Sequence, residues 1–371
     1  MGTANGISVY NEELTYRELY QWGCVQLAQA EISELQLDAR LLLEYCCSTD
    51  RNTLLAHGER RISAEEYGRY ADCIARRKGH VPLQHIIGEQ DFMGLTFIVN
   101  ENVLIPRQDT EVLVEEVMRH LHDGMRILDL CTGSGCILLS LLHYSNGCTG
   151  VGVDVSEEAL RVAEENAERI LGIRMRGQEQ RQEQRQSEEQ GQSQEQEYSQ
   201  EQRQIQEVKR EQEQSQEQWQ KQEERRTQEQ ETKQEQEQEQ KQSVSDTQSK
   251  FSLIQSDLFE NLDAHDKYDI IVSNPPYIKT SVIDMLMPEV REHEPYIALD
   301  GREDGLFFYR EIIAQAGGYL AGGGMLFFEI GYDQSEEVRR LMECAGYTDV
   351  EIIKDFAGLD RVVCGVYKMM L

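Results

Sequence analysis

The sequence predicts an α/β fold, a mainly parallel sheet with helices on both faces, preceded by a small helical domain. Beyond residue 107, runs of strand length alternate with helical segments, which is typical of a parallel sheet. Helix-start signals dominate the first 88 residues instead. We expect seven strands, the last two forming an antiparallel pair: residues 125–130, 149–154, 251–255, 268–272, 322–330, 350–353 and 361–367.

The helical domain is expected over residues 1–88. Thr15 and Glu18 have the spacing of a capping box, in which each side chain binds the other residue's backbone N–H, and they predict a helix over 16–31. Further helices are predicted over residues 35–43 and 63–79. Because this domain contains no catalytic constellation of side chains, we expect it to recognise the substrate.

Residues 89–106 are expected to form a β-hairpin that links this domain to the sheet domain, residues 107–371. Apolar side chains alternate on both sides of Gly94, which is a hairpin signal. A helix running to His122 follows the hairpin, and Asp109 or Thr110 is expected to cap it.

Arg107 and Glu111 lie at the start of that helix. They form either a salt bridge at the helix start or part of a pocket wall, and the sequence leaves both interpretations open.

Overall composition restricts the class of protein. The 371 residues suggest two domains, and the formal net charge of −31 disfavours a protein that binds mainly by neutralising phosphates. The nine cysteines include no C-x-x-C pair, so the sequence supports neither a disulfide framework nor a zinc site. The N-terminus lacks a signal-peptide pattern, and no apolar run reaches membrane-spanning length. We expect a cytoplasmic protein that binds no membrane.

A glycine-containing turn between the first strand and its helix predicts a ligand site. Such a turn lets a ligand approach the backbone and meet free N–H groups at the helix start. The dinucleotide pattern G-x-G-x-x-G is not satisfied, which disfavours NAD or FAD. The second strand ends in Asp154, whose carboxylate can accept both hydroxyls of a ribose or, alternatively, only cap the next helix. The turn consists of Cys131, Thr132, Gly133, Ser134 and Gly135.

A second candidate site follows the apolar strand 268–272. The strand stops abruptly at Asn274, Pro275, Pro276 and Tyr277, where the prolines make the turn rigid. The Asn274 side-chain oxygen and a proline carbonyl are two acceptors suited to the hydrogens of a planar NH₂ group, and the Tyr277 ring can stack on the same plane. The bland alternative is a proline-rich turn after a core strand.

Residues 174–250 form a tract rich in Gln, Glu and Arg. Such a composition buries too little apolar surface to offset the entropy of ordering, so we expect a disordered or solvated helical insertion. The tract leaves the helix behind the second strand and enters the third, which puts it at the edge of the sheet opposite the ligand crevice.

Together these motifs resemble a known family. D-L-C-T-G-S-G (129–135), S-D-L-F (256–259) and N-P-P-Y (274–277) look like class I S-adenosylmethionine-dependent methyltransferases, Rossmann-like enzymes that act here on amide or amino nitrogens. The helical N-terminal domain and the motifs I-P-R-Q-D-T-E (105–111), E-P-Y-I-A-L-D-G (294–301) and D-R-V-V (360–363) narrow the resemblance to the HemK/PrmC family, the peptide chain release factor glutamine N5-methyltransferases. The resemblance covers essentially the whole chain except the tract.

The resemblance implies a role for each motif. Residues 131–135 would surround the methionine part of S-adenosylmethionine, Asp154 the ribose, and Asp257 with Leu258 the adenine. Asn274, Pro275, Pro276 and Tyr277 would hold the substrate glutamine, with Asn274 also next to the cofactor. Two departures from the family pattern bear on cofactor affinity: Cys131 stands where many methyltransferases have Gly, and Leu258 stands where an aromatic is common.

The implied reaction is in-line methyl transfer to the amide nitrogen of the Gln in the Gly-Gly-Gln loop of translation release factors, with no strong base required. The implied partner is a release factor, without direct contact to nucleic acid, and the enzyme is expected to be a monomer. Two alternatives remain: an adenine N6 or other exocyclic amine methyltransferase of nucleic acids, and a cofactor-binding scaffold that recruits partners through the tract.

Overall fold

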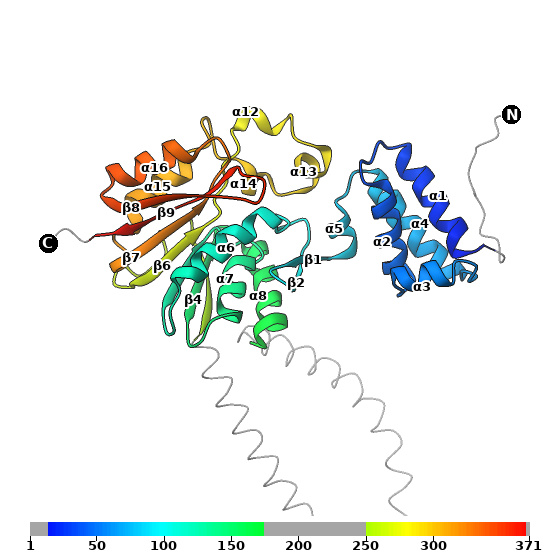
Figure 1. Ribbon diagram of the computed structural model, residues 1–371, viewed down its shortest axis with the longest axis horizontal. Coiled ribbons are helices and arrows are strands. Elements are labelled where there is room, and N and C mark those ends of the chain that lie inside the picture. The colour runs from blue at the N-terminus through cyan, green and yellow to red at the C-terminus, as the bar shows by residue number, and fades with distance from the viewer. Residues whose placement is uncertain (1–13, 174–249, 369–371) are drawn as a thin grey trace, which may run out of the picture.

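The computed structural model describes residues 14–173 and 250–368 (Figure 1). The helical part comes first, and its helices pack around one buried core that includes Leu19, Leu42 and Tyr70. The Thr15–Glu18 capping box is confirmed, and Ser63 with Glu66 forms a second one. The shortest two helices were not predicted because five or six residues show no clear periodicity. The helices are α1 (Tyr16–Ala28), α2 (Leu35–Cys46), α3 (Arg51–Ala56), α4 (Ala64–Lys78) and α5 (Leu83–Ile87).

A β-hairpin follows, formed by β1 (Glu89–Phe92) and β2 (Leu95–Ile98). Met93 and Gly94 both have positive φ, the conformation that two-residue hairpin turns require. The Met93 N–H donates to Glu111 Oε1 at 2.7 Å. Glu111 therefore holds the hairpin against the sheet domain and forms no helix-start salt bridge with Arg107.

The large sheet has seven strands in the order β5-β4-β3-β6-β7-β9-β8. All neighbours run parallel except β7 with β9 and β8 with β9. The antiparallel pairing of β8 with β9 was predicted, whereas that of β7 with β9 was not. Its strands are β3 (Arg126–Leu130), β4 (Thr149–Asp154), β5 (Phe251–Gln255), β6 (Tyr268–Ser273), β7 (Leu320–Glu329), β8 (Tyr347–Lys354) and β9 (Asp360–Tyr367).

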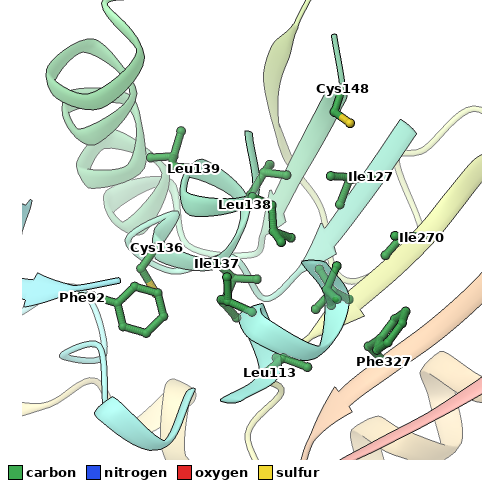
Figure 2. Packing of buried hydrophobic residues seen from close by; sticks show 14 of the residues in the cluster. Phe92, Leu113, Ile127, Cys136, Ile137, Leu138, Leu139, Cys148, Ile270 and Phe327 are labelled. Atoms are coloured by element: carbon green, nitrogen blue, oxygen red, sulfur yellow. The ribbon is translucent and has the colours of Figure 1, made fainter. Parts of the chain in front are cut away.

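Helices cover both faces of the sheet. Figure 2 shows the core on one face, where Leu138 packs near Ile127 and Phe92 of the hairpin contributes its ring. A separate buried cluster lies on the opposite face. The first face carries α6 (Gln108–His120), α7 (Cys136–His143) and α8 (Glu157–Leu171), and the second carries α15 (Phe307–Ala316) and α16 (Ser335–Cys344).

The start of α6 differs from the prediction. Its N-cap residue is Arg107 and makes no side-chain cap hydrogen bond, so Asp109 and Thr110 lie inside the first turn. Asp109 instead pairs with Arg361 of β9, with 3.1 Å between Oδ2 and Nη2. Thr110 is buried, 2% exposed. A capping residue read from the sequence can be wrong by one or two positions. Here the contact of Asp109 with the distant strand β9 accompanies a helix start at Arg107.

The segment after β6 contains three short helices, α12 (Thr280–Ile283), α13 (Pro288–His293) and α14 (Tyr296–Leu299), which lie between the sheet and the helical part in Figure 1. Buried Arg77 of α4 binds Asp38 Oδ2 at 2.7 Å and also Glu289 Oε1 of α13 at 3.1 Å. This segment therefore links the two parts of the chain.

The predicted insertion lies outside the described residues apart from Lys250. On either side of it, Ile173 and Phe251 are both buried in the same core cluster. The chain thus leaves and re-enters the sheet domain at anchored positions. None of the described helices has the length and apolar character needed to cross a membrane.

Candidate active site

A pocket of about 240 Å³ opens at the carboxyl ends of the parallel strands. Crevices at this edge are where open α/β sheets bind ligands. Most of the predicted site residues lie in its wall: Cys131, Thr132, Gly133, Ser134, Asp154, Asp257, Leu258, Asn274 and Pro276. Gly135, Pro275 and Tyr277, although predicted as site residues, are not among the lining residues.

The turn after β3 is shaped by its backbone. Cys131, Gly133 and Gly135 have φ of 59°, 54° and 78°, in the left-handed region. Glycine is favoured there because it lacks a Cβ, so the backbone at Cys131 has a conformation that suits the glycine expected at this position from other methyltransferases. A Cβ on Gly135 would lie 3.0 Å from the Leu139 side chain, so Gly135 serves close packing behind the pocket.

Asp154 holds this turn in place. Its Oδ2 accepts a hydrogen bond from the Gly133 N–H at 2.9 Å, and its Oδ1 accepts from the Ser156 N–H at 3.0 Å. Burial raises the pKa of Asp154, and these N–H groups partly offset the rise. The helix-cap alternative for Asp154 is wrong, because the Ser156 hydroxyl caps α8 by accepting from Ala159 N–H.

A second carboxyl group supports the turn from below. Asp129, at the end of β3, is fully buried and accepts the Thr132 hydroxyl at 2.7 Å. Burial raises the pKa of Asp129 to about 7. Asp129 was predicted to lie in this strand, but its support of the turn was not predicted.

Next to this turn, Asn274 follows β6. The Ser273 hydroxyl donates to the Leu130 carbonyl at 2.7 Å and ties the ends of β6 and β3 together. The Asn274 Nδ2 donates to Thr110 Oγ1 at 3.4 Å, which leaves the side-chain oxygen available as an acceptor. Asn274 and the turn 131–134 thus line the same pocket.

Tyr277 is directed away from the pocket. Its hydroxyl donates to the buried carboxyl of Glu329, with 3.3 Å to Oε1, and its ring packs against the core cluster. Burial and the neighbouring Glu329 raise the pKa of Tyr277 well above its usual value. The expected stacking of this ring on the substrate therefore does not match its position, because a buried carboxyl provides a partner for the hydroxyl.

Two other segments complete the pocket. Sequence reasoning assigned no ligand contact to the linker or to the segment after α13, although both contain motifs that were noted. Gly301 is the glycine of the motif 294–301. A Cβ on it would lie 2.7 Å from the Tyr277 backbone, so only glycine allows the two segments to approach this closely. The additional lining residues include Asn102, Val103, Pro106, Arg107, Pro295, Ile297, Arg302 and Phe308. Arg107 thus lines the pocket and also binds buried Glu294, 2.5 Å between Nη2 and Oε1.

The residues present fit S-adenosylmethionine, the cofactor that the resemblance implies. Its adenine requires apolar contact and its sulfonium and ammonium groups are cationic. The wall offers Leu258, Val155 and Phe308 as apolar surface, and Asp154 and Asp257 as carboxylates. The described residues contain no cluster that could hold a metal ion.

Comparison with known proteins identifies three matching regions. The family model of the PrmC N-terminal domain matches residues 18–88, and that of a methyltransferase domain matches residues 121–176. A third family model, the Eco57I restriction-modification methylase, matches residues 149–298.

Curated relatives match over most of their length. The release factor glutamine methyltransferase of Caulobacter vibrioides is 34% identical, covering 92% of this chain and 92% of that protein. That of Geobacter sulfurreducens is 32% identical and covers 95% and 96%. A solved release-factor-specific protein-(glutamine-N5) methyltransferase from Alicyclobacillus acidocaldarius is 23% identical, covering 74% of this chain and all of that one, with a TM-score of 0.33, too low to add to the sequence evidence. On the strength of the two curated relatives, the chain belongs to the release factor glutamine methyltransferase family.

Proposed function

We propose that this protein transfers the methyl group of S-adenosylmethionine to the side-chain amide nitrogen of the glutamine in the Gly-Gly-Gln loop of a release factor. The observation that carries the proposal is the pairing of a cofactor-type turn with Asn274 across one pocket, in a chain of this family. The cofactor, when bound, supplies an electrophilic methyl group.

The protein's own contribution is orientation. An amide nitrogen is a weak nucleophile because its lone pair is delocalised into the carbonyl. The Asn274 oxygen and the Pro275 carbonyl accept the two amide hydrogens, aim the nitrogen at the methyl group and stabilise the charge that develops on it. Holding two reactants in attack geometry can contribute about 7–11 kcal/mol. Pro276 keeps the turn rigid, and Tyr277 anchors it through Glu329.

The remaining assignments belong to the same proposal. Residues 131–135, Asp154, Asp257 and Leu258 bind the cofactor. The helical part, residues 1–88, recognises the release factor, and the hairpin region 89–106 joins it to the methyltransferase domain, residues 107–371. We propose that the enzyme works as a monomer in the cytoplasm without binding nucleic acid directly.

A second candidate, methylation of an exocyclic amine in nucleic acid, is favoured by the match to the Eco57I methylase. The net charge of −31 opposes it, because nucleic-acid binding depends on neutralising phosphates.

The test is methyl transfer from radiolabelled S-adenosylmethionine. The enzyme is incubated with a release factor, with the same factor carrying alanine for the Gly-Gly-Gln glutamine, and with duplex and single-stranded DNA. We expect label on the first factor alone. Label on DNA, or equal label on both factors, would overturn the proposal.

A further inference from the structure

The short helix α13 joins the helical part of the chain to the sheet domain through side-chain contacts. At its start, Glu289 Oε1 lies 3.1 Å from Arg77 Nη2 of α4. At its end, His293 Nε2 lies 3.0 Å from the carbonyl oxygen of Gly79, the residue directly after α4. Two points on α13 therefore meet the end of one helix of the helical part, which agrees with the place of α13 between the two parts in Figure 1.

The residues that follow α13 belong to the pocket. Glu294 is buried, and its carboxylate binds Arg107, which lines the pocket. Pro295, Ile297 and Ala298 come next in the chain and line the pocket as well. The pocket end of α13 thus has an anchor of its own, separate from the contact with the helical part.

The Arg77 guanidinium is oriented by the helical part itself. Its Nε donates to Asp38 Oδ2 at 2.7 Å, and its Nη1 donates to the Val81 carbonyl at 3.4 Å. Because a guanidinium is planar and rigid, these two bonds fix the direction in which the remaining nitrogen, Nη2, donates. That nitrogen is the one that binds Glu289 of α13.

Glu289 presents a charged acceptor to this donor. Burial raises the pKa of the Glu289 carboxyl, but its own backbone N–H, Arg77 and His80 outweigh that effect, so the pKa lies below its usual value. The carboxyl is therefore ionised at neutral pH. The Arg77 side chain is 8% exposed and that of Glu289 is 22% exposed, so water screens the pair only in part.

We propose that the ion pair between Arg77 and Glu289 fixes the direction of the helical part relative to the pocket, so that a release factor bound to the helical part presents its glutamine to Asn274. The inference rests on the proposed function, because it concerns how that substrate reaches the pocket. Arg77 and Glu289 are positioning residues, and neither is among the residues that line the pocket.

A protein substrate must make two contacts at once. Once a release factor has docked on the helical part, its glutamine enters the pocket in an intramolecular step, and the effective concentration for that step depends on the geometry of the connection. The chain joins the two parts at Gly88, between α5 and β1, where φ is 85°. Parts of one chain are expected to move relative to each other unless a large contact holds them. The contact through α13 restricts this motion.

The experiment measures the KM for a release factor, the kcat and the Kd of S-adenosylmethionine in full-length Glu289→Gln. Glutamine keeps the shape of the side chain and removes its charge. We expect KM to rise about tenfold, as for loss of one hydrogen bond between charged groups. The kcat at saturating release factor and the Kd of the cofactor should stay within about twofold of wild type, because the pocket and its anchor at Glu294 are unchanged.

A second variant tests the other side of the contact. Arg77→Lys keeps a positive charge beside Asp38 but replaces the fork by a single ammonium group, which lacks the fixed geometry that serves both partners. KM should rise as in Glu289→Gln. The double variant should be no worse than either single variant, because both remove the same contact.

The matched control is Glu292→Gln. Glu292 lies on the same helix, and its carboxylate binds the neighbouring Arg291. Its KM should equal that of wild type. Thermal unfolding identifies a variant that fails to fold, and if Arg77→Lys does, the comparison of Glu289→Gln with Glu292→Gln decides alone.

Three results would overturn the inference. They are an unchanged KM in Glu289→Gln, the same rise in Glu292→Gln, and a weakening of cofactor binding as large as the rise in KM, which would place the effect in the pocket. Additive effects of Arg77→Lys and Glu289→Gln would overturn it as well. Failure of the wild-type enzyme to label the release factor would instead overturn the proposed function.

Discussion

On the cofactor side of the pocket, Cys131, Gly133 and Gly135 take left-handed backbone conformations within a single turn. On the acceptor side, Asn274 is held by Thr110, which lies 164 residues away in sequence, and Tyr277 is held by Glu329, 52 residues away. The first side is shaped by local backbone geometry, and the second by side chains that only the folded sheet brings together. Substitutions on the first side should therefore change mainly cofactor affinity, and substitutions on the second side should change mainly turnover.

The largest difference between the effect on turnover and the effect on cofactor affinity is expected for Asn274→Ala. Turnover should fall roughly 10²–10³-fold, as it does when one group that stabilises developing charge is removed. The Kd of S-adenosylmethionine should stay near the wild-type value, because the turn proposed to bind it, residues 131–135, is unchanged. Single-turnover rates and equilibrium binding measure the two quantities. A near-normal rate would remove Asn274 from the mechanism.

Asp154→Ala should show the opposite behaviour. The variant loses the carboxylate expected to bind the ribose and also the acceptor of the Gly133 N–H. Hydrogen bonds to charged groups contribute about 1.5–3 kcal/mol, which corresponds to cofactor affinity reduced roughly 10–100-fold. Turnover at saturating cofactor should change much less. The matched control is Asp257→Ala, expected to weaken binding without disturbing the turn. Unchanged affinity in Asp154→Ala would contradict the assignment.

The raised pKa of Asp129, which supports the turn after β3, predicts that the free energy of unfolding depends on pH. Burial raises its pKa from 3.8 to about 7. The folded protein thus keeps a proton that the unfolded chain releases above its lower pKa, so this residue makes the free energy of unfolding fall as pH rises from about 4 to about 7. Denaturant unfolding at several pH values should show a weaker fall in Asp129→Asn than in wild type. The same slope in Asp129→Asn as in the exposed control Asp123→Asn would show that Asp129 is not responsible.

The smallest effect is expected at Cys131. Glycine relieves the strain of φ 59° but loses apolar packing and chain rigidity, so Cys131→Gly should alter stability by less than about 1 kcal/mol and preserve cofactor affinity. Valine at the same position is branched at Cβ, and a strained backbone costs about 1–3 kcal/mol. Thermal unfolding and cofactor titration of the two variants provide the comparison. Equal stability and equal cofactor affinity of Cys131→Gly and Cys131→Val would mean that the left-handed backbone at residue 131 affects neither property.

Most of the site residues predicted from the sequence line the pocket, because they occur in short motifs at strand ends. The turn after β3 begins directly after its strand, and Asp154, the pair Asp257 and Leu258, and Asn274 each lie at the end of a strand or within three residues after it. Parallel strands bring their carboxyl ends to one edge, so residues at those positions meet whatever the connections between them. The roles assigned to these residues in binding and catalysis stay predictions.

Other features depended on contacts that no local pattern contains. Tyr277 was expected to stack on the substrate, but burial next to Glu329 turns it into the core. Asp109 and Thr110 were expected to cap α6, yet Arg361 and Asn274 are their partners. In each case the side chain had one plausible local partner and a better one from a distant strand or helix.

The alternation of strands and helices along the chain, the site at the carboxyl ends of the strands and the family of the protein were contained in the amino-acid sequence, because periodicity, turn residues and motifs are local properties of the chain. The orientation of Tyr277, the hydrogen bond between Asn274 and Thr110, and the raised pKa of Asp129 arose only on folding. Those features depend on which polar groups are buried together, and burial is a property of the packed molecule as a whole.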